Sequence, residues 1–518
     1  MFRTALISLF LTSAALADTW TVDDDGKADF DNIQAAIDAA SDGDTVEVQA
    51  GTYFETIDFL GKSISVTGVA GSVVTIINAQ FAGTAVTISG TDAVTTLAGF
   101  TIEKGYTSFG GGLNISNCQD LQFIDCHVSA NIATYGGGIH ATSCVMTFQD
   151  CDITGNTANA GGGVHATSCE MTFRDSFIRN NQTNGGENVG GGLSLYTCTV
   201  DMFDTVISGN TAVNNGGGAR VEQTPVSMEG GGILGNTSQD SDGGGLYLTY
   251  SDLSASGVEF SDNYAYSQGG AMYSTNDPRV NLFGCYGSNN RTSNCENSSS
   301  NYQGGTIYLY GNAIATVYDC NFRDGCSGRG GWMYVGGTSV VDIYNTILGG
   351  FSSVYSYQGE TIYVNSPSTI VFVANSVICG SGSDPIDGGW VDKGGNSFPS
   401  SCPEFIDTGS CCLNGLCTSM TYDDCNSIYG IFQGVGLDCA DSQCPAVSEP
   451  TGACCLDMGQ CVATLENDCL AANGSFAGLG VLCADSACPE HCYGDIDGNG
   501  TVNIVDVLGV MASWGACP

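Results

Sequence analysis

Clusters of glycine recur through the middle of this chain. Pairs or triplets of glycine, with one degenerate final copy, begin at positions 110, 136, 161, 190, 216, 243, 269, 304, 330 and 359. Successive starts are 25 to 35 residues apart, and no helical pattern fills the intervals. Internal repeats of this length predict a solenoid in which each repeat adds one coil. The glycines are expected at turns, where φ is positive or a neighbouring backbone leaves no room for a Cβ.

Two columns of residues follow each glycine cluster in the same register. The third residue after each start is apolar: Leu113, Ile139, Val164, Leu193, Ala219, Leu246, Met272, Ile307, Met333, Ile362. The next residue is polar or amphipathic: Asn114, His140, His165, Ser194, Arg220, Tyr247, Tyr273, Tyr308, Tyr334, Tyr363. Neighbours on a strand point to opposite faces, so the first column is expected in the core and the second in water. The repeats therefore predict an all-β solenoid.

A third column consists of asparagines late in seven consecutive coils: Asn131, Asn156, Asn181, Asn210, Asn236, Asn263, Asn290. Asparagine tolerates left-handed backbone, and its side-chain amide can bond the amide of the neighbouring coil. The spacing favours an asparagine ladder at a bend of the solenoid, and an ordinary polar loop is the alternative.

Acidic residues dominate the charge of the chain. Its 518 residues include 12 Lys and Arg against 54 Asp and Glu, which gives a formal net charge of −42. This charge repels phosphate backbones and acidic lipids, so nucleic-acid binding is excluded. Divalent cations and neutral partners remain compatible with it, and solubility in a saline medium explains most of it. After residue 17 no apolar run is long enough to span a membrane.

The first residues are typical of a secretory signal peptide. Arg3 precedes an apolar run over residues 5–11, and Ala15-Leu16-Ala17 matches an A-x-A cleavage site. Residues 1–17 are therefore predicted as the signal, with Asp18 as the mature N-terminus. Export to an oxidising compartment agrees with the 26 Cys of the chain. The protein is expected outside the cell or at its surface.

The stretch after the signal resembles a known family. Residues 31–40 place apolar side chains on one helical face, and short alternating strands follow. The chain reads Phe30-x2-Ile33-Gln34-x-Ala36-Ile37, then Gly43-Asp44-Thr45-Val46-x-Val48-x2-Gly51-Thr52-Tyr53. This pattern resembles the opening of right-handed parallel β-helix proteins of the pectin-lyase-like superfamily. In that family the helix caps the open end of the solenoid.

The resemblance extends over residues 18–405. It implies an N-terminal cap with the first coils at 18–109, then glycine-rich coils of a right-handed parallel β-helix at 110–405. The Gly-Gly-x repeats also resemble those of polymorphic outer-membrane proteins. Because the superfamily includes lyases, hydrolases, esterases and adhesins, it implies the fold more strongly than any activity.

Two cysteine-rich modules follow, at residues 406–446 and 451–490. Each module begins with a Cys-Cys pair and contains four more Cys. The successive gaps after the pair are 4, 7, 13 and 4 residues in the first module and 5, 7, 13 and 4 in the second. Three disulfides would stabilise a module whose hydrophobic core is too small to keep it folded. Zinc coordination by the cysteines is the alternative, although neither module contains His. In the solenoid, Cys295 and Cys326 are expected to pair. Inter-coil bridges or stacked free thiols both fit a column of four: Cys118, Cys144, Cys169, Cys198.

Residues 491–518 carry the clearest chemical motif. Oxygen-bearing side chains occupy positions 1, 3, 5, 9 and 12 of a calcium-type loop, with Gly500 at position 6 and a carbonyl ligand at position 7. The expected Ca²⁺ ligands are Asp495, Asp497, Asn499, Thr501, Asn503 and Asp506. The motif resembles one half of a type I dockerin, which implies Ca²⁺ and a protein partner, although the second half is missing. An Asp-rich turn without metal is the alternative.

Candidates for catalysis come from a column of aspartates before a bend. The column comprises Asp125, Asp150, Asp175 and Asp204. Paired carboxylates serve glycoside hydrolysis when they lie about 5 to 9.5 Å apart. The catalytic candidates are Asp150, Asp175, Asp204 and Arg174. Arg174 and Arg179 are expected to neutralise the column. Bend chemistry or weak calcium sites explain the same pattern.

The polar column after the glycines holds the remaining candidates. Its last five members are expected to stack about 4.8 Å apart: Tyr247, Tyr273, Tyr308, Tyr334, Tyr363. Stacking alone would stabilise neighbouring coils, whereas an exposed aromatic strip would give the sugar rings of a neutral glycan a platform. Earlier in the column, His140 and His165 fit a transition-metal pair or plain surface.

These features favour a secreted or cell-surface protein that is structural, adhesive or glycan-binding. Its expected partners are a polysaccharide or cell-surface glycan and a protein bound through the calcium module. An extracellular polysaccharide lyase or glycoside hydrolase is the alternative, because the superfamily contains such enzymes. No catalytic constellation is evident from the residues.

Overall fold

The computed structural model describes residues 17–185, 189–293, 302–349, 361–380 and 385–400, together with six strands between residues 408 and 479. The chain forms two compact units, Met1–Phe405 and Ile406–Pro518. Within the described residues, no helix is long and apolar enough to cross a membrane.

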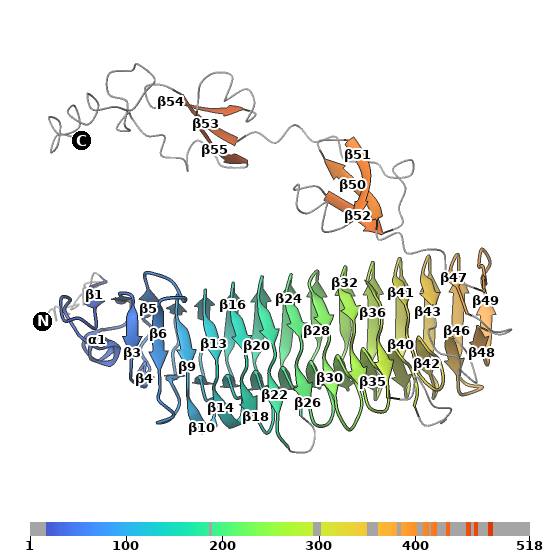
Figure 1. The fold of residues 1–518 in the computed structure, drawn as a ribbon, viewed down its shortest axis with the longest axis horizontal. Helices are drawn as coiled ribbons and strands as arrows, with labels where there is room; N and C mark the ends of the chain where they lie inside the picture. Colours follow the sequence, from blue (N-terminus) through green and yellow to red (C-terminus); the bar gives the residue numbers. More distant parts are fainter. Residues whose placement is uncertain are drawn as a thin grey trace, which may run out of the picture. The chain divides into compact units, whose positions relative to one another are not determined.

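The first unit is a parallel β-solenoid whose coils add strands to the same walls (Figure 1). Sheet A has 15 strands, from β1 (Thr19–Val22) to β49 (Trp390–Asp392). Sheet B has 13 strands, from β3 (Gly51–Tyr53) to β47 (Val377–Ile378). Neighbouring strands pair in parallel, as β1 does with β2 (Thr45–Val48). The predicted all-β parallel solenoid is confirmed.

Two further sheets complete the walls. Sheet C has 13 strands, from β4 (Ile57–Asp58) to β48 (Ile386–Asp387). Sheet D has eight, from β10 (Tyr106–Phe109) to β38 (Arg291–Thr292). Coils with a strand in sheet D therefore have a fourth wall.

One coil illustrates the path of the chain. It passes through sheets C, A, B and D in β15 (Ile139–Thr142), β16 (Val145–Gln149), β17 (Asp152–Thr154) and β18 (Thr157–Ala158). In β15 the first and third side chains are buried and His140 is half-buried, as the alternation predicts. The buried side chains of successive coils form one continuous core.

The predicted N-terminal helix is present as α1 (Ile33–Ala39). Asn32 caps it by accepting a hydrogen bond from a backbone N–H of the first turn. Its apolar face buries Ile33, Ala36 and Ile37 in the core of the solenoid. Figure 1 shows the helix beside β1, at the N-terminal end of the solenoid.

The glycine clusters form the turn from sheet D to sheet C. Gly136 has a φ of 65°, in the left-handed region. The next position has no room for a side chain, because a Cβ on Gly137 would lie 2.5 Å from the carbonyl oxygens of Gly162 and Thr157. The clusters therefore provide both a left-handed turn and a close backbone contact between coils, as predicted.

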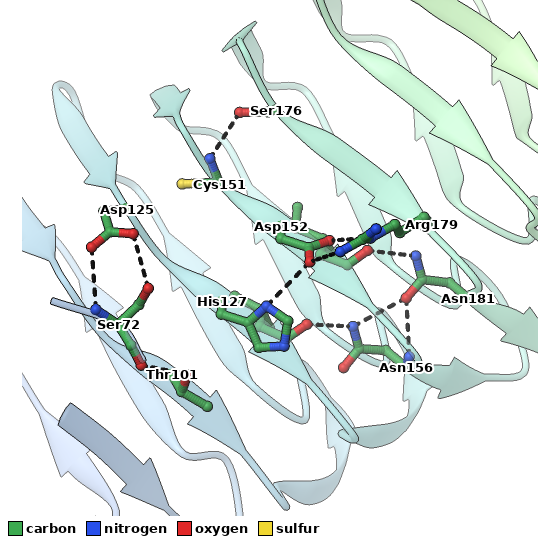
Figure 2. A network of polar contacts seen from close by, with 12 residues as sticks. Ser72, Thr101, Asp125, His127, Cys151, Asp152, Asn156, Ser176, Arg179 and Asn181 are labelled. Atoms are coloured by element: carbon green, nitrogen blue, oxygen red, sulfur yellow. Dashed lines mark hydrogen bonds and ion pairs between the residues drawn. The ribbon is translucent and has the colours of Figure 1, made fainter. Parts of the chain in front are cut away.

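The asparagine column forms the predicted ladder. All seven side chains are 0% exposed. Asn156 Nδ2 donates to the carbonyl of Val128 at 2.8 Å and to Asn181 Oδ1 at 3.1 Å, and the Asn156 backbone N–H donates to the same oxygen at 3.0 Å (Figure 2). The ladder therefore bonds each coil to the next, and the polar-loop alternative is wrong.

The four-cysteine column holds buried, free thiols. Each thiol donates to the backbone carbonyl two residues earlier, as Cys144 does to Thr142 at 3.2 Å. In later coils the hydroxyls of Thr224 and Ser251 make the equivalent bond, each at 2.9 Å. Cysteine thus replaces a hydroxyl residue as the donor at this corner, and the structure has stacked thiols rather than bridges.

The second unit contains two three-stranded antiparallel sheets with the same strand order. In the first, β50 (Thr408–Leu413) lies between β51 (Leu416–Thr421) and β52 (Ile431–Val435). In the second, β53 (Gly452–Leu456) lies between β54 (Gln460–Thr464) and β55 (Ser475–Leu479). The shared order matches the cysteine repeat in the sequence. Residues 1–16, Cys295 and the calcium motif at 491–518 lie outside the described residues.

Candidate functional site

The predicted catalytic aspartates form the corner between sheets A and B. Asp150, Asp175 and Asp204 have φ values of 53°, 48° and 44°. Left-handed backbone favours Gly, Asn and Asp, and later coils use only these types at the same corner: Gly230, Gly257, Gly284, Asp319, Asn345, Asn375. The backbone turn therefore explains the column. A catalytic role for these carboxylates stays a prediction.

The two arginines expected to neutralise this column interact elsewhere, so that expectation is wrong. Arg174 stacks on its registered neighbour across sheet A, with its guanidinium carbon 4.2 Å from the ring centroid of Phe203. Arg179 donates to Asp152 from Nη2 at 2.7 Å and from Nε at 3.1 Å. Each guanidinium thus meets a partner on the adjacent strand rather than at the turn.

Asp152 links three consecutive coils on the outer face of sheet B (Figure 2). His127 lies in β13 (His127–Ser129), and its Nδ1 is 3.2 Å from Asp152 Oδ2. Burial raises the pKa of Asp152, but hydrogen bonds from His127 and Arg179 outweigh it and leave that pKa below its ordinary value. In the described part of the chain, the His127 side chain hydrogen-bonds only to Asp152. The cluster is therefore an inter-coil ion-pair bridge.

The tyrosine column stands in sheet C at the predicted spacing. Neighbouring ring centroids lie 4.8, 4.9, 4.8 and 5.5 Å apart, with interplanar angles of 3° to 24°. Parallel rings at this distance cover one another's faces, so their edges and hydroxyl groups form the outer surface. Exposure was expected for the whole column, but Tyr308 and Tyr334 are only 6% and 2% exposed. Binding by these tyrosines stays a prediction.

In earlier coils the outer side chains of sheets C and D touch beside the glycine turn. The Phe109 ring lies 5.0 Å from His140, and the Tyr135 ring lies 5.3 Å from His165. Outer side chains of two sheets can touch only where the two surfaces face each other. We call this surface the C/D corner; it comprises the polar column of sheet C and the residues that precede the glycines: Phe109, Tyr135, Ala160, Val189, Asn215, Asp242, Gln268, Gln303, Arg329.

Three ionisable side chains along the C/D corner have a buried atom without a hydrogen-bond partner. The atoms are Nδ1 of His165, Nε of Arg220 and Oδ1 of Asp242. In the described residues nine side-chain atoms are buried in this way, and the other six belong to Thr, Ser and Trp. Buried polar groups are normally hydrogen-bonded, so these three atoms are the ionisable groups of this surface whose hydrogen-bonding capacity the protein itself does not use.

Burial also alters the protonation of these groups. It raises the pKa of Asp242 to about 6. It lowers the pKa of His165 to about 4, and the charges of His140 and Arg220 act in the same direction. Arg220 forms an ion pair with Glu222. At neutral pH the C/D corner therefore combines an anionic Asp242, a neutral His165 and a paired arginine.

Asp242 and Arg220 are absent from the candidates predicted from sequence. Asp242 is the only carboxylate in the column before the glycines, and Arg220 is the only arginine in the polar column of sheet C. A residue that departs from the chemistry of its column is a usable signal in a repeat protein. Their buried, unpartnered atoms become evident only once the two walls are placed together.

The predicted metal sites have unequal outcomes. In the described part of the chain, no group of three or more His, Cys, Asp or Glu is arranged to hold a metal ion. His140 and His165 stack with ring centroids 5.7 Å apart, and His140 Nδ1 lies 3.2 Å from Asn114 Oδ1. The Ca²⁺ loop at residues 495–506 lies outside the described residues and stays a prediction.

Comparisons with known proteins give only distant likenesses. No family model and no curated protein matches the chain. A pectin methylesterase from carrot aligns at 14% identity and a TM-score of 0.27, over 57% of this chain and 90% of that chain. The gp42 tailspike of Acinetobacter phage vb_AbaP_AS12 aligns at 11% identity and a TM-score of 0.32, over 74% of this chain and 60% of that chain. The tailspike receptor binding domain of siphovirus 9NA aligns at 11% identity and a TM-score of 0.27, over 74% of this chain and 78% of that chain. Values this low carry no functional argument.

Proposed function

We propose that this chain is an exported β-solenoid protein that binds a polysaccharide along the C/D corner. The observation that carries the proposal is the grouping of unpartnered buried atoms on His165, Arg220 and Asp242. Two of them lie in the same column as the tyrosine stack, whose edges supply further hydroxyl groups. Protein sites for polar ligands combine apolar side chains with a few such donors and acceptors.

The repeat makes this corner suited to a polymer. Equivalent positions recur once per coil, about 4.8 Å apart. The stacked rings of Tyr247, Tyr273 and Tyr308 follow this spacing, at 4.8 and 4.9 Å. A chain of sugars lying along the solenoid axis would meet a hydroxyl or polar group at each step. Because the ring faces are covered, we expect hydrogen bonds from phenol hydroxyls rather than stacking of sugars on rings.

This expectation sets the first prediction. Changing Tyr247 and Tyr273 together to Phe removes two hydroxyls and keeps both stacked rings. Each lost hydrogen bond costs about 1 kcal/mol, so affinity for a retained glycan should fall about tenfold or more. A glycan array screened with the wild-type protein identifies the ligand, and calorimetry measures the change.

The matched control is Tyr318→Phe, which removes a phenol hydroxyl from a more exposed tyrosine of sheet A. Tyr318 is 39% exposed and lies in β40 (Ile314–Tyr318). Glycan affinity should not change in this variant. Equal losses in the control and the double variant, or no loss in either, would contradict binding at the C/D corner.

A polysaccharide lyase or glycoside hydrolase is the second candidate function. Its support is the pKa of Asp204, which is raised by burial and then by the charges of Asp175 and Glu229. A carboxyl group with a raised pKa is suited to act as a general acid. New reducing ends or unsaturated uronates released from a retained glycan would favour this candidate over simple binding.

We also propose that the C-terminal motif binds Ca²⁺ and attaches the protein to a partner. The support is the spacing of oxygen ligands from Asp495 to Asp506, with Gly500 at the sharp turn. Asp495→Ala should abolish calcium uptake at this loop, as measured by calorimetry on the full chain. High-affinity uptake that persists unchanged in this variant would place the site elsewhere.

A further inference from the structure

Asp242 occupies a special place in the C/D corner. It directly precedes Gly243, whose φ is 64°, at the turn from sheet D to sheet C. The equivalent residues of the adjacent coils are Asn215 and Gln268, both uncharged. The Asp242 backbone N–H lies 3.5 Å from Asn215 Oδ1, and the Gln268 backbone and the Ser267 side chain hydrogen-bond to the carboxylate. Its Oδ1 atom still has no partner.

Among the residues that the structure describes, no cation forms an ion pair with Asp242. The turn places Asp242 beside the tyrosine column, because a Cβ on the adjacent Gly243 would lie 3.0 Å from Tyr247 Cα. Burial raises the pKa of the phenols of Tyr247 and Tyr273, and the charge of Asp242 adds to this. The cationic side chain on this part of the sheet is Arg220, and it is already paired with Glu222. Asp242 thus stands as a negative charge beside a wall of phenol groups.

The Asp242 carboxylate and the neighbouring phenol groups favour some classes of ligand over others. A ligand anion would be repelled by Asp242 and by the net charge of −42. A neutral hydroxyl would give one hydrogen bond to Oδ1. A compact ammonium group has three donors, forms a charge-assisted bond with the carboxylate, and can donate to neighbouring phenol oxygens as well. Hydrogen bonds of charged partners are about twice as strong as those of neutral partners.

We infer that the C/D corner selects amino sugars: the protonated amine of a de-N-acetylated sugar binds Asp242, and the hydroxyls of Tyr247 and Tyr273 accept its remaining hydrogens. This inference rests on the proposed function, because it names the class of glycan that the same corner takes. Asp242 is partly exposed as a residue, whereas its Oδ1 atom is buried, so binding of the amine requires the carboxylate to turn toward solvent. Since the tyrosine ring faces cover one another, the phenol oxygens rather than the ring faces receive the amine.

Two sets of oligosaccharides test the inference, because they differ only in charge at the nitrogen. Oligomers of glucosamine and of N-acetylglucosamine, of the same length and linkage, are titrated into the full chain by calorimetry at neutral pH. The glucosamine oligomer should bind at least about tenfold more tightly, as expected for a charge-assisted bond. Asp242→Asn should remove this preference while leaving weak binding of both oligomers.

The matched control is Asp240→Asn, which removes the same charge two residues away. Asp240 is exposed, so its charge contributes to the general attraction of cations but not to a defined contact. The preference for glucosamine should survive in this variant. An equal loss in the Asp240 and Asp242 variants would show that long-range attraction alone causes the preference, and the inference would be overturned.

The remaining outcomes separate this inference from the proposed function. If both oligomers or other neutral glycans bind the corner equally well, glycan binding stands and selection of amino sugars is wrong. If a lysine-rich peptide binds Asp242 more tightly than the glucosamine oligomer, the corner takes cationic peptides and the sugar class is wrong. If no glycan binds and the tyrosine variants change nothing, the proposed function fails as well.

Discussion

Replacing Asn181 with alanine is expected to lower the free energy of unfolding of the solenoid by about 4 kcal/mol. The side chain is 0% exposed and makes four hydrogen bonds. Its Oδ1 accepts from the backbone and side-chain nitrogens of Asn156 at 3.0 and 3.1 Å. Its Nδ2 donates to the carbonyl of Ile153 at 2.8 Å and to Asn210 Oδ1 at 3.1 Å. Alanine removes all four bonds. Asn156 Nδ2 keeps its bond to the Val128 carbonyl, and Asn210 Oδ1 keeps the bond from the residue 181 backbone N–H, whereas each buried group left without a partner costs about 1 to 3 kcal/mol.

Urea unfolding followed by circular dichroism measures the loss, and hydrogen exchange locates it. Because a solenoid is stabilised by contacts between adjacent coils, exchange should accelerate most in the coils that contain Asn156, Asn181 and Asn210. Asn181→Asp should be worse than alanine, since it buries a carboxylate against the acceptors Ile153 O and Asn210 Oδ1.

A neighbouring residue provides the control. Asn180 is exposed and has a φ of 53°, so Asn180→Gly keeps the left-handed turn and removes no ladder contact. Its effect should stay below about 1 kcal/mol. If Asn181→Ala unfolds at the same urea concentration as this control, the ladder does not hold the coils together.

Asp242→Asn is expected to stabilise the protein at neutral pH by about 3 kcal/mol. Burial raises the pKa of Asp242 to about 6, whereas the unfolded chain has the ordinary value of 3.8. Two pKa units correspond to about 3 kcal/mol. Between these two pKa values the folded state binds more protons than the unfolded state, so stability falls as pH rises from about 4 to about 6 and is then constant. Asparagine has a similar shape and does not ionise, so the variant avoids this loss.

The pH dependence is the decisive measurement. The free energies of unfolding of the wild type and of Asp242→Asn should differ most at pH 7 to 8 and converge as the pH falls below the ordinary pKa of 3.8, where Asp242 is protonated in both states. Asp240→Asn, at an exposed position, should follow the wild type at every pH. A constant difference between wild type and Asp242→Asn across this range would mean that ionisation of Asp242 is not the cause.

The sequence predicts the coil well because the requirements of a coil are local and repeat. Glycine is needed wherever backbones approach too closely for a Cβ, as at Gly137. Asparagine is needed wherever a bend requires a side-chain amide that hydrogen-bonds to both neighbouring coils, as at Asn156. Every coil meets the same constraint, so the same residue type returns at the same place. The aspartates at the corner between sheets A and B follow this logic too. Their column therefore marks a left-handed turn first, whatever chemistry the carboxylates add.

The candidate site depends on a different kind of information. Repeat spacing places Tyr308 and Tyr334 in one outer column and predicts the distance between their rings, since coils stack at the spacing of parallel strands. Their burial and the surroundings of Asp242 depend on how side chains from different walls and coils pack around the column. No periodic pattern along the chain encodes that packing. Glycine and asparagine columns thus specify each coil, whereas the charged corner arises from the walls that the coils build.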